Sequence, residues 1–148
     1  MIEKLEELLN SLNKGTHEVE KDFSFHQPDS FENSESFKDD ITIIFDNYDI
    51  SCDIEWSYNR KKGQKGDHLT PDDSDVITLD YIDAENFSFS EDGEEHEMNL
   101  DKYPKLKKIF LNYIIELLKD GYVDEVDPRV YKYYLKENRL LKFSDFIS

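Results

Sequence analysis

The sequence predicts an α+β protein: an antiparallel β-meander of four or five strands, packed by a long helix in the C-terminal half, with a short N-terminal helix and a short final helix. Strand-like alternation in the middle of the chain and helical spacing at both ends are the basis of this prediction. A length of 148 residues fits one domain. We expect a single domain over residues 1–148, made of an N-terminal helix (1–15), an irregular segment (16–37), an acidic β-sheet region (38–100) and a helical C-terminal region (101–148).

The N-terminal helix is predicted from leucines three and four residues apart in residues 2–13, IEKLEELLNSLN. Lys14 and Gly15 favour a helix end directly after it. The following residues, 16–37, are mostly polar, with scattered phenylalanines. They predict a loop or a short irregular strand laid over the core.

Two strands are predicted at 39–45 and 48–58. Odd-numbered apolar residues mark one face of the first strand, and even-numbered ones, from Tyr48 to Tyr58, mark one face of the second. The change of phase across residues 46–47, Asp-Asn, indicates a two-residue hairpin turn. One long strand with a bulge at 46–47 is the alternative.

A long loop is predicted at 59–74, where Arg60, Lys61, Lys62 and Lys65 form a basic island in the acidic region. Two more strands are predicted at 75–83 and 85–90. In the first, Ile77, Leu79 and Tyr81 form the apolar face, and Thr78 and Asp80 lie on the opposite face. In the second, Phe87 and Phe89 point to the same side. Asp92-Gly93 is a turn signal, and His96, Met98 and Leu100 predict a last short strand.

The C-terminal region predicts two helices. The first begins near Asp101, with Pro104 in its first turn, and ends at Gly121. Its apolar stripe consists of Leu106, Ile109, Phe110, Tyr113, Ile114, Leu117 and Leu118. Asp127-Pro128 is a second helix-start signal, and the helix after it extends to about residue 141.

Charge is distributed unevenly along the chain, whose net charge is −17. Residues 1–15 contain 3 acids and 2 bases, residues 16–100 contain 24 and 6, and residues 101–148 contain 8 and 10, giving −1, −18 and +2. The excess of acids in the middle region predicts a surface of negative potential. Such a surface disfavours direct binding to nucleic acid or to an anionic membrane.

The single cysteine, Cys52, excludes an internal disulfide and lies on the apolar side of its strand, which favours a buried thiol in a reducing, cytoplasmic setting. The chain shows no secretion-signal pattern and no stretch near the roughly 20 apolar residues of a membrane span. We therefore expect a soluble cytoplasmic protein.

No pattern in the sequence indicates a catalytic or metal site. The GQKG sequence at 63–66 does not open a helix, as a phosphate-binding loop would. His96, within EEHE, is interpreted as part of a solvated turn rather than a metal ligand. Asp46, Asp49 and Asp53 lack the central glycine of a calcium loop. We expect no enzymatic activity, no cofactor and no bound metal.

The strand at 48–58 carries only negative charge on its polar side. Like charges crowded on one sheet repel each other, so they indicate either a role in solubility or a basic partner. The acids predicted to bind that partner are Asp49, Asp53, Glu55, Asp80, Asp83, Glu91, Asp92, Glu94, Glu95 and Glu97. Trp56 and Tyr58, near the strand end, are possible aromatic anchors if they are exposed.

These features predict a non-catalytic inhibitor whose acidic sheet face docks on the basic nucleic-acid-binding surface of a partner, a nucleic-acid-handling enzyme or complex. In size and composition the chain resembles phage anti-defence proteins that mimic nucleic acid and immunity proteins that neutralise nuclease toxins. An immunity protein is the alternative reading within this class. A structural or scaffold accessory subunit, whose acidity serves solubility, is the alternative of another class.

Overall fold

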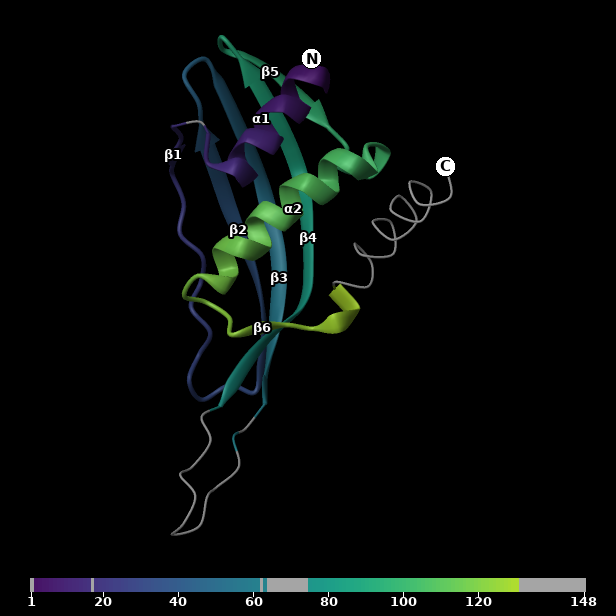
Figure 1. Cartoon of the computed structure of the whole chain (residues 1–148). Helices are drawn as coiled ribbons and strands as arrows, with labels where there is room; N and C mark the ends of the chain where they lie inside the picture. The colour runs from purple at the N-terminus through teal and green to yellow at the C-terminus, as the bar shows by residue number, and fades with distance from the viewer. Residues whose placement is uncertain (1, 17, 62, 64–74, 131–148) are drawn as a thin grey trace.

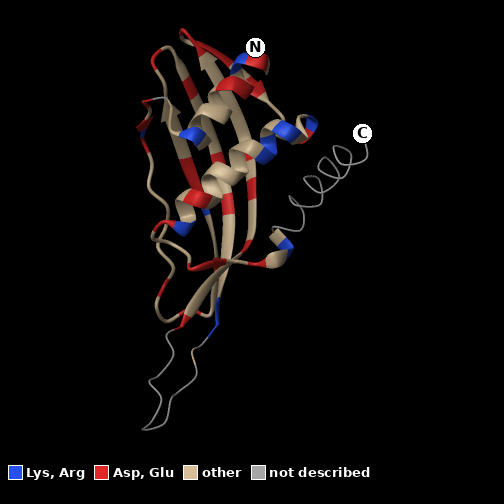
Figure 2. Ribbon diagram, in the orientation of Figure 1, with Lys and Arg blue, Asp and Glu red and all other residues tan. Residues whose placement is uncertain are grey.

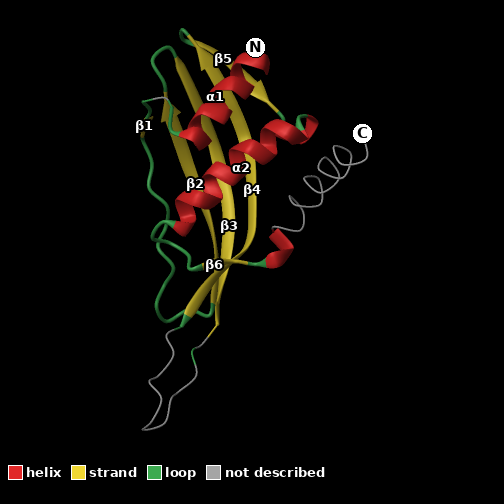
Figure 3. Cartoon of the chain, in the orientation of Figure 1, coloured by secondary structure: helices red, strands yellow, loops and turns green. Residues whose placement is uncertain are grey.

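Two helices lie across one face of a curled, mostly antiparallel sheet (Figure 1, Figure 3). The computed structural model describes residues 2–16, 18–61, 63 and 75–130. The strands are β1 (Glu20–Lys21), β2 (Ser34–Ile44), β3 (Tyr48–Lys61), β4 (Val76–Glu91), β5 (Glu94–Met98) and β6 (Glu125–Val126), and the helices are α1 (Ile2–Lys14), the 3₁₀ turn η1 (Leu100–Lys102) and α2 (Pro104–Lys119). The order β1-β2-β3-β4-β5 is an antiparallel meander, and β6 pairs with β4 in parallel. The predicted α+β class is confirmed.

The hairpin of β2 and β3 turns at residues 46–47, as predicted. Phe45 N donates to Tyr48 O at 2.8 Å, and Ile44 lies opposite Asp49. The alternative of one long strand is therefore wrong. β2 begins at Ser34, inside the segment predicted to be irregular, because β3 is long enough to pair with residues 34–37.

β4 is one continuous strand where two were predicted. Its pairing with β3 shifts between Ser51 and Asp53 and again between Ser57 and Tyr58, and each shift leaves an extra residue on β4. A bulge of this kind reverses the alternation of faces along a strand. The placement of Tyr81 on the apolar face is therefore wrong, since Tyr81 is exposed and Ile82 is buried.

The hairpin of β4 and β5 confirms the turn predicted at Asp92-Gly93. Both residues have positive φ, 49° and 88°, as a two-residue turn of type I′ requires. β5 follows directly, but Leu100 begins η1 instead of extending the strand. The helix expected from Asp101 therefore starts after that turn, at Pro104.

The core lies between the helices and the sheet face that they cover. α1 contributes four buried leucines, and α2 buries Leu106, Phe110, Leu111, Ile114, Ile115 and Leu118. The rings of Phe87 on β4 and Phe110 on α2 meet edge to face at 5.3 Å. Three members of the predicted stripe, Ile109, Tyr113 and Leu117, are only partly buried.

After α2 the chain returns to the sheet through β6. Asp127 Oδ1 accepts from Arg129 N at 2.8 Å, and a helical turn starts at Pro128, where a helix start was predicted. The rest of the predicted helix, and Lys62 and Lys65 of the basic island, lie outside the described residues. No helix in the described ranges has the length and apolar character needed to cross a membrane.

Candidate functional site

The candidate site is the outer face of the sheet, which we define as the face turned away from α1 and α2 (Figure 1). Figure 2 shows acidic residues recurring along the strands of this sheet. Pairing across β2, β3 and β4 sets them in two neighbouring rows: Asp40, Asp53 and Glu85 in one, and Lys38, Glu55 and Asp83 in the other. We call these six residues the acidic rows. They contain five carboxylates and one ammonium, a net charge of −4.

Alternation along β3 places these carboxylates on the surface. Cys52, Ile54 and Trp56 point into the core, so Asp53 and Glu55 between them point outward. Neighbouring strands lie about 4.8 Å apart and alternate residues about 6.7 Å apart, so each carboxylate has others within a Debye length. The rows therefore act as one patch of negative potential.

The patch continues beyond the acidic rows toward the β4–β5 hairpin. Glu97 and Glu95 on β5 lie opposite Ser88 and Ser90, the outward residues of β4. Asp49 lies opposite Ser90 from the other side. Serine side chains therefore lie between these three carboxylates and the acidic rows. The outer face gains negative charge in this part without placing two carboxylates directly opposite each other.

Asp40 and Asp53 lie directly opposite each other on β2 and β3, and their pKa values shift in opposite directions. The hydrogen bond between them raises the pKa of Asp40, and the charge of Asp53 adds to that rise. The same bond lowers the pKa of Asp53, and Asn86 Nδ2, which donates to Asp53 Oδ2 at 2.8 Å, lowers it further. As the pH falls, Asp40 takes up a proton first and Asp53 stays ionised.

Two lysines partly neutralise the β4 side of the rows. Lys38 Nζ lies 3.2 Å from Glu85 Oε2, and this hydrogen bond raises the pKa of Lys38. Lys107 reaches from α2 to Asp83 Oδ1 at 2.8 Å. Neither Glu55 nor Asp49 has an ion pair with any residue that the structure describes.

The other acids predicted to bind a partner lie at different places. Asp80 is in the β4 bulge on the outer face, where it accepts from Ser57 Oγ and from Asn59 Nδ2 at 3.2 Å. Glu91, Asp92 and Glu94 are exposed at the β4–β5 turn, at the end of the sheet. The structure therefore brings together Asp49, Asp53, Glu55, Asp83, Glu95 and Glu97 on one face, and leaves the turn acids at its rim.

The possible aromatic anchors are in the core. Trp56 and Tyr58 are both 0% exposed, so neither side chain offers a surface to a partner. Trp56 Nε1 donates to Asp39 Oδ2 at 2.8 Å, and His26 Nδ1 lies 2.5 Å from the other oxygen of that buried carboxylate. These contacts tie the loop before β2 to the inner side of the sheet, which is a structural role.

Sequence reasoning missed Asp40 and Lys38. Asp40 is out of phase with Ile41 and Ile43, so the alternation at 39–45 already assigned it to the polar face of its strand. Lys38 has the same phase as Asp40 but lies just before the predicted strand. Glu85 was harder to place, because its row depends on the bulge that shifts β4 against β3. Asp39 shares the phase of the buried isoleucines, which was a signal for its burial.

Within the described residues, no three or more His, Cys, Asp or Glu side chains are grouped to hold a metal ion. Burial raises the pKa of the Cys52 thiol, so that group is a poor nucleophile in the folded protein. Comparison with known proteins found no family model, no curated protein and no solved structure that matches this chain.

Proposed function

We propose that this protein is a non-catalytic binding protein that docks the outer face of its sheet on the basic nucleic-acid-binding surface of a partner. The observation that supports this proposal is the pair of acidic rows on a face that no described helix covers. Directly opposed carboxylates repel each other and weaken the sheet. A basic partner would convert that repulsion into attraction on binding.

The repeat of the acidic rows suits a surface that handles nucleic acid. Outward residues along a strand repeat at about 6.7 Å, close to two phosphate steps of one strand of duplex DNA at about 3.4 Å each. In this proposal the partner's lysines and arginines contact the carboxylates, and the sheet sterically blocks access for nucleic acid. Electrostatic steering would speed association at low salt.

We take α2 to be the helix that packs the sheet from behind and keeps the outer face in shape. Its Phe110 ring lies against Phe87 of β4, the strand that carries Asp83 and Glu85. We place the protein in the cytoplasm, where its single buried cysteine remains reduced. An immunity protein would use the same face against a nuclease toxin, and the identity of the partner separates the two.

A charge-neutralised triple variant, Asp49→Asn/Asp53→Asn/Glu55→Gln, tests the proposal. The protein and the variant are used to capture partners from lysate of the source cells at low and high salt, and captured proteins are challenged with duplex DNA and with RNA. We expect the wild type to retain a nucleic-acid-handling protein that either competitor releases. The triple variant should bind it at least about tenfold more weakly, mainly through slower association.

The matched control is Glu3→Gln/Glu7→Gln/Glu116→Gln, whose exposed acids lie on the two helices. Each triple changes the net charge from −17 to −14 by removing three acids. Equal weakening by both triples would mean that net charge alone governs binding, which contradicts the proposal. Binding unaffected by either triple, or by nucleic-acid competitor, would instead favour an accessory subunit whose acidity serves solubility.

A further inference from the structure

The middle of β4 is paired on one side only. β3 pairs with β4 along most of its length, whereas on the other side β5 pairs with residues 87–91 and β6 with Thr78 and Leu79. Among the described residues, nothing pairs with residues 80–86 on that second side. We call residues 80–86 the open edge. Within it, Ala84 N donates to the side chain of its own neighbour, Asp83 Oδ1, at 2.9 Å.

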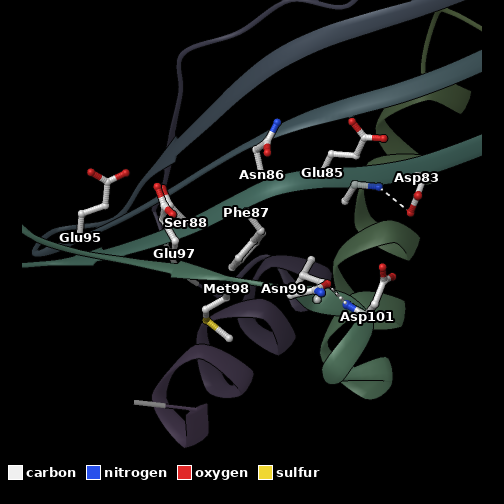
Figure 4. A pocket seen from close by; sticks show the side chains of 12 residues that line it. Asp83, Glu85, Asn86, Phe87, Ser88, Glu95, Glu97, Met98, Asn99 and Asp101 are labelled. Carbon is white, nitrogen blue, oxygen red and sulfur yellow. Dashed lines mark hydrogen bonds between the residues drawn. The ribbon is translucent and has the colours of Figure 1, made fainter.

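A hollow of about 590 Å³ lies beside the open edge, where β5 leaves β4 and the chain turns into η1. Figure 4 shows the side chains that line this edge hollow. Its carboxylates are Asp83, Glu85, Glu95, Glu97 and Asp101. Lys107 already pairs with Asp83 and Asp101, and Lys38 pairs with Glu85, so Glu95 and Glu97 are the two without an ion pair among the described residues. The end of the hollow at Glu95 and Glu97 therefore favours a cationic group.

Ser88 offers a hydroxyl group to the hollow. Ser88 is 8% exposed and lines the hollow between β4 and β5. It makes no hydrogen bond to another side chain or backbone group in the part of the chain that the structure describes. No fully buried side-chain oxygen among the described residues lacks a partner, so the Ser88 hydroxyl is accessible from the hollow that it lines, where a bound group can reach it.

The chain itself shows that this region accepts an ammonium group. Lys107 Nζ lies between Asp83 at 2.8 Å and Asp101 at 2.5 Å, two of the hollow's carboxylates. Burial alone would lower the pKa of Lys107, but its hydrogen bonds to Asp101 and Asp83 raise it. Glu95 and Glu97, further along the hollow, have no ion pair with any described residue.

We infer that an extended basic segment of a partner protein adds as a strand to the open edge and places a lysine or arginine side chain in the edge hollow. Strand addition would form backbone hydrogen bonds along residues 80–86, replacing the local bond from Ala84 N to Asp83 Oδ1, and Glu95 and Glu97 would select a cationic segment. This inference rests on the proposed function and names a contact that the partner makes.

Charges and bulges also protect free sheet edges from unwanted pairing. The open edge has both features, since Asp80, Asp83 and Glu85 lie on it and bulges flank it. Protection by charge requires no hollow beside the strand, however. The edge hollow, with Glu95, Glu97 and the accessible Ser88 hydroxyl on its wall, is therefore the feature that favours a ligand.

The test uses a short capped peptide in which arginine alternates with valine, and the same peptide with every second amide N-methylated. Both carry the same charge, but only the first can pair along a strand. We expect the first peptide to protect the amide of Ile82 from hydrogen exchange, measured by NMR. N-methylation should weaken its affinity at least about tenfold, because two or more backbone hydrogen bonds are lost.

The protein variant Glu95→Gln/Glu97→Gln should weaken binding of the first peptide, and Glu3→Gln/Glu7→Gln should not. Equal affinity for both peptides would overturn strand addition, and so would an amide of Ile82 that is already protected in the free protein. An unaffected Glu95/Glu97 variant would overturn the role of the hollow. These failures are distinct from failure of the proposed function, which is judged by the Asp49/Asp53/Glu55 triple on the captured partner.

Discussion

At the scale of single residues, the facing aspartates Asp40 and Asp53 are the most informative pair. The two side chains are hydrogen-bonded across neighbouring strands, and this bond raises the pKa of Asp40 and lowers the pKa of Asp53. Because the folded-state pKa of Asp40 is raised, its contribution to stability is present in acid and is lost as the pH rises through that pKa. Asp53 behaves in the opposite way, since its lowered pKa contributes stability that is lost as the pH falls.

Replacing Asp40 by Asn should therefore stabilise the protein at neutral pH and have little effect in acid. At neutral pH both carboxylates are ionised, and the substitution removes their repulsion. Near pH 3, about one unit below an ordinary aspartate pKa, the wild type already carries the proton on Asp40. Urea denaturation of both proteins over this pH range gives the measurement.

Asp46→Asn is the control for that experiment, because Asp46 is an exposed aspartate of the β2–β3 turn and its loss changes the net charge equally. If the two variants show the same pH dependence, the stabilisation reflects overall charge. The interpretation of Asp40 and Asp53 as one titrating pair would then be wrong.

At the scale of elements, α2 contacts β4 through a buried aromatic residue. Phe110 is 0% exposed, and its ring packs edge to face on Phe87. Phe110→Ala should lower the free energy of unfolding by about 3–5 kcal/mol, through lost burial and the cavity that remains. Chemical denaturation followed by circular dichroism measures this change.

Glu116→Ala is the matched control on the same helix. Its side chain is exposed and lies 3.6 Å from Lys119, a surface ion pair of small energetic value. We expect a change within about 0.5 kcal/mol. A Phe110→Ala effect as small as that of the control would show that α2 contributes little to holding the sheet.

At the scale of the whole molecule, charge is divided between the two sides of the sheet. Carboxylates gather on the outer face, while lysines gather at the start of α2 on the other side (Figure 2). This asymmetry would orient the protein as it approaches a basic partner. The apolar core lies between the two sides and contains the single cysteine.

Stability of the whole molecule should depend neither on metal nor on disulfide chemistry. The described core is apolar and continuous, and a chain of this size buries enough surface to fold without such support. Thermal unfolding followed by circular dichroism should be unchanged by a chelator or by a reductant. A lower midpoint on adding chelator would show that a bound metal contributes to folding.

The sequence by itself determined the α+β class, the β2–β3 hairpin and the outward placement of Asp53 and Glu55. These features follow from local periodicity and turn chemistry, which act over a few residues. The buried face of β3, from Ile50 to Tyr58, was likewise determined by alternation alone.

Only the tertiary structure decided which carboxylates stand together. The bulges of β4 move Tyr81 outward and set Asp83 and Glu85 opposite Glu55 and Asp53. Register depends on pairing between segments distant in sequence, and a shift of one residue reverses the faces of a strand. The open edge was decided in the same way, because it exists where β5 and β6 stop pairing with β4. No local pattern in residues 80–86 shows that, among the described residues, no strand pairs with them on that side.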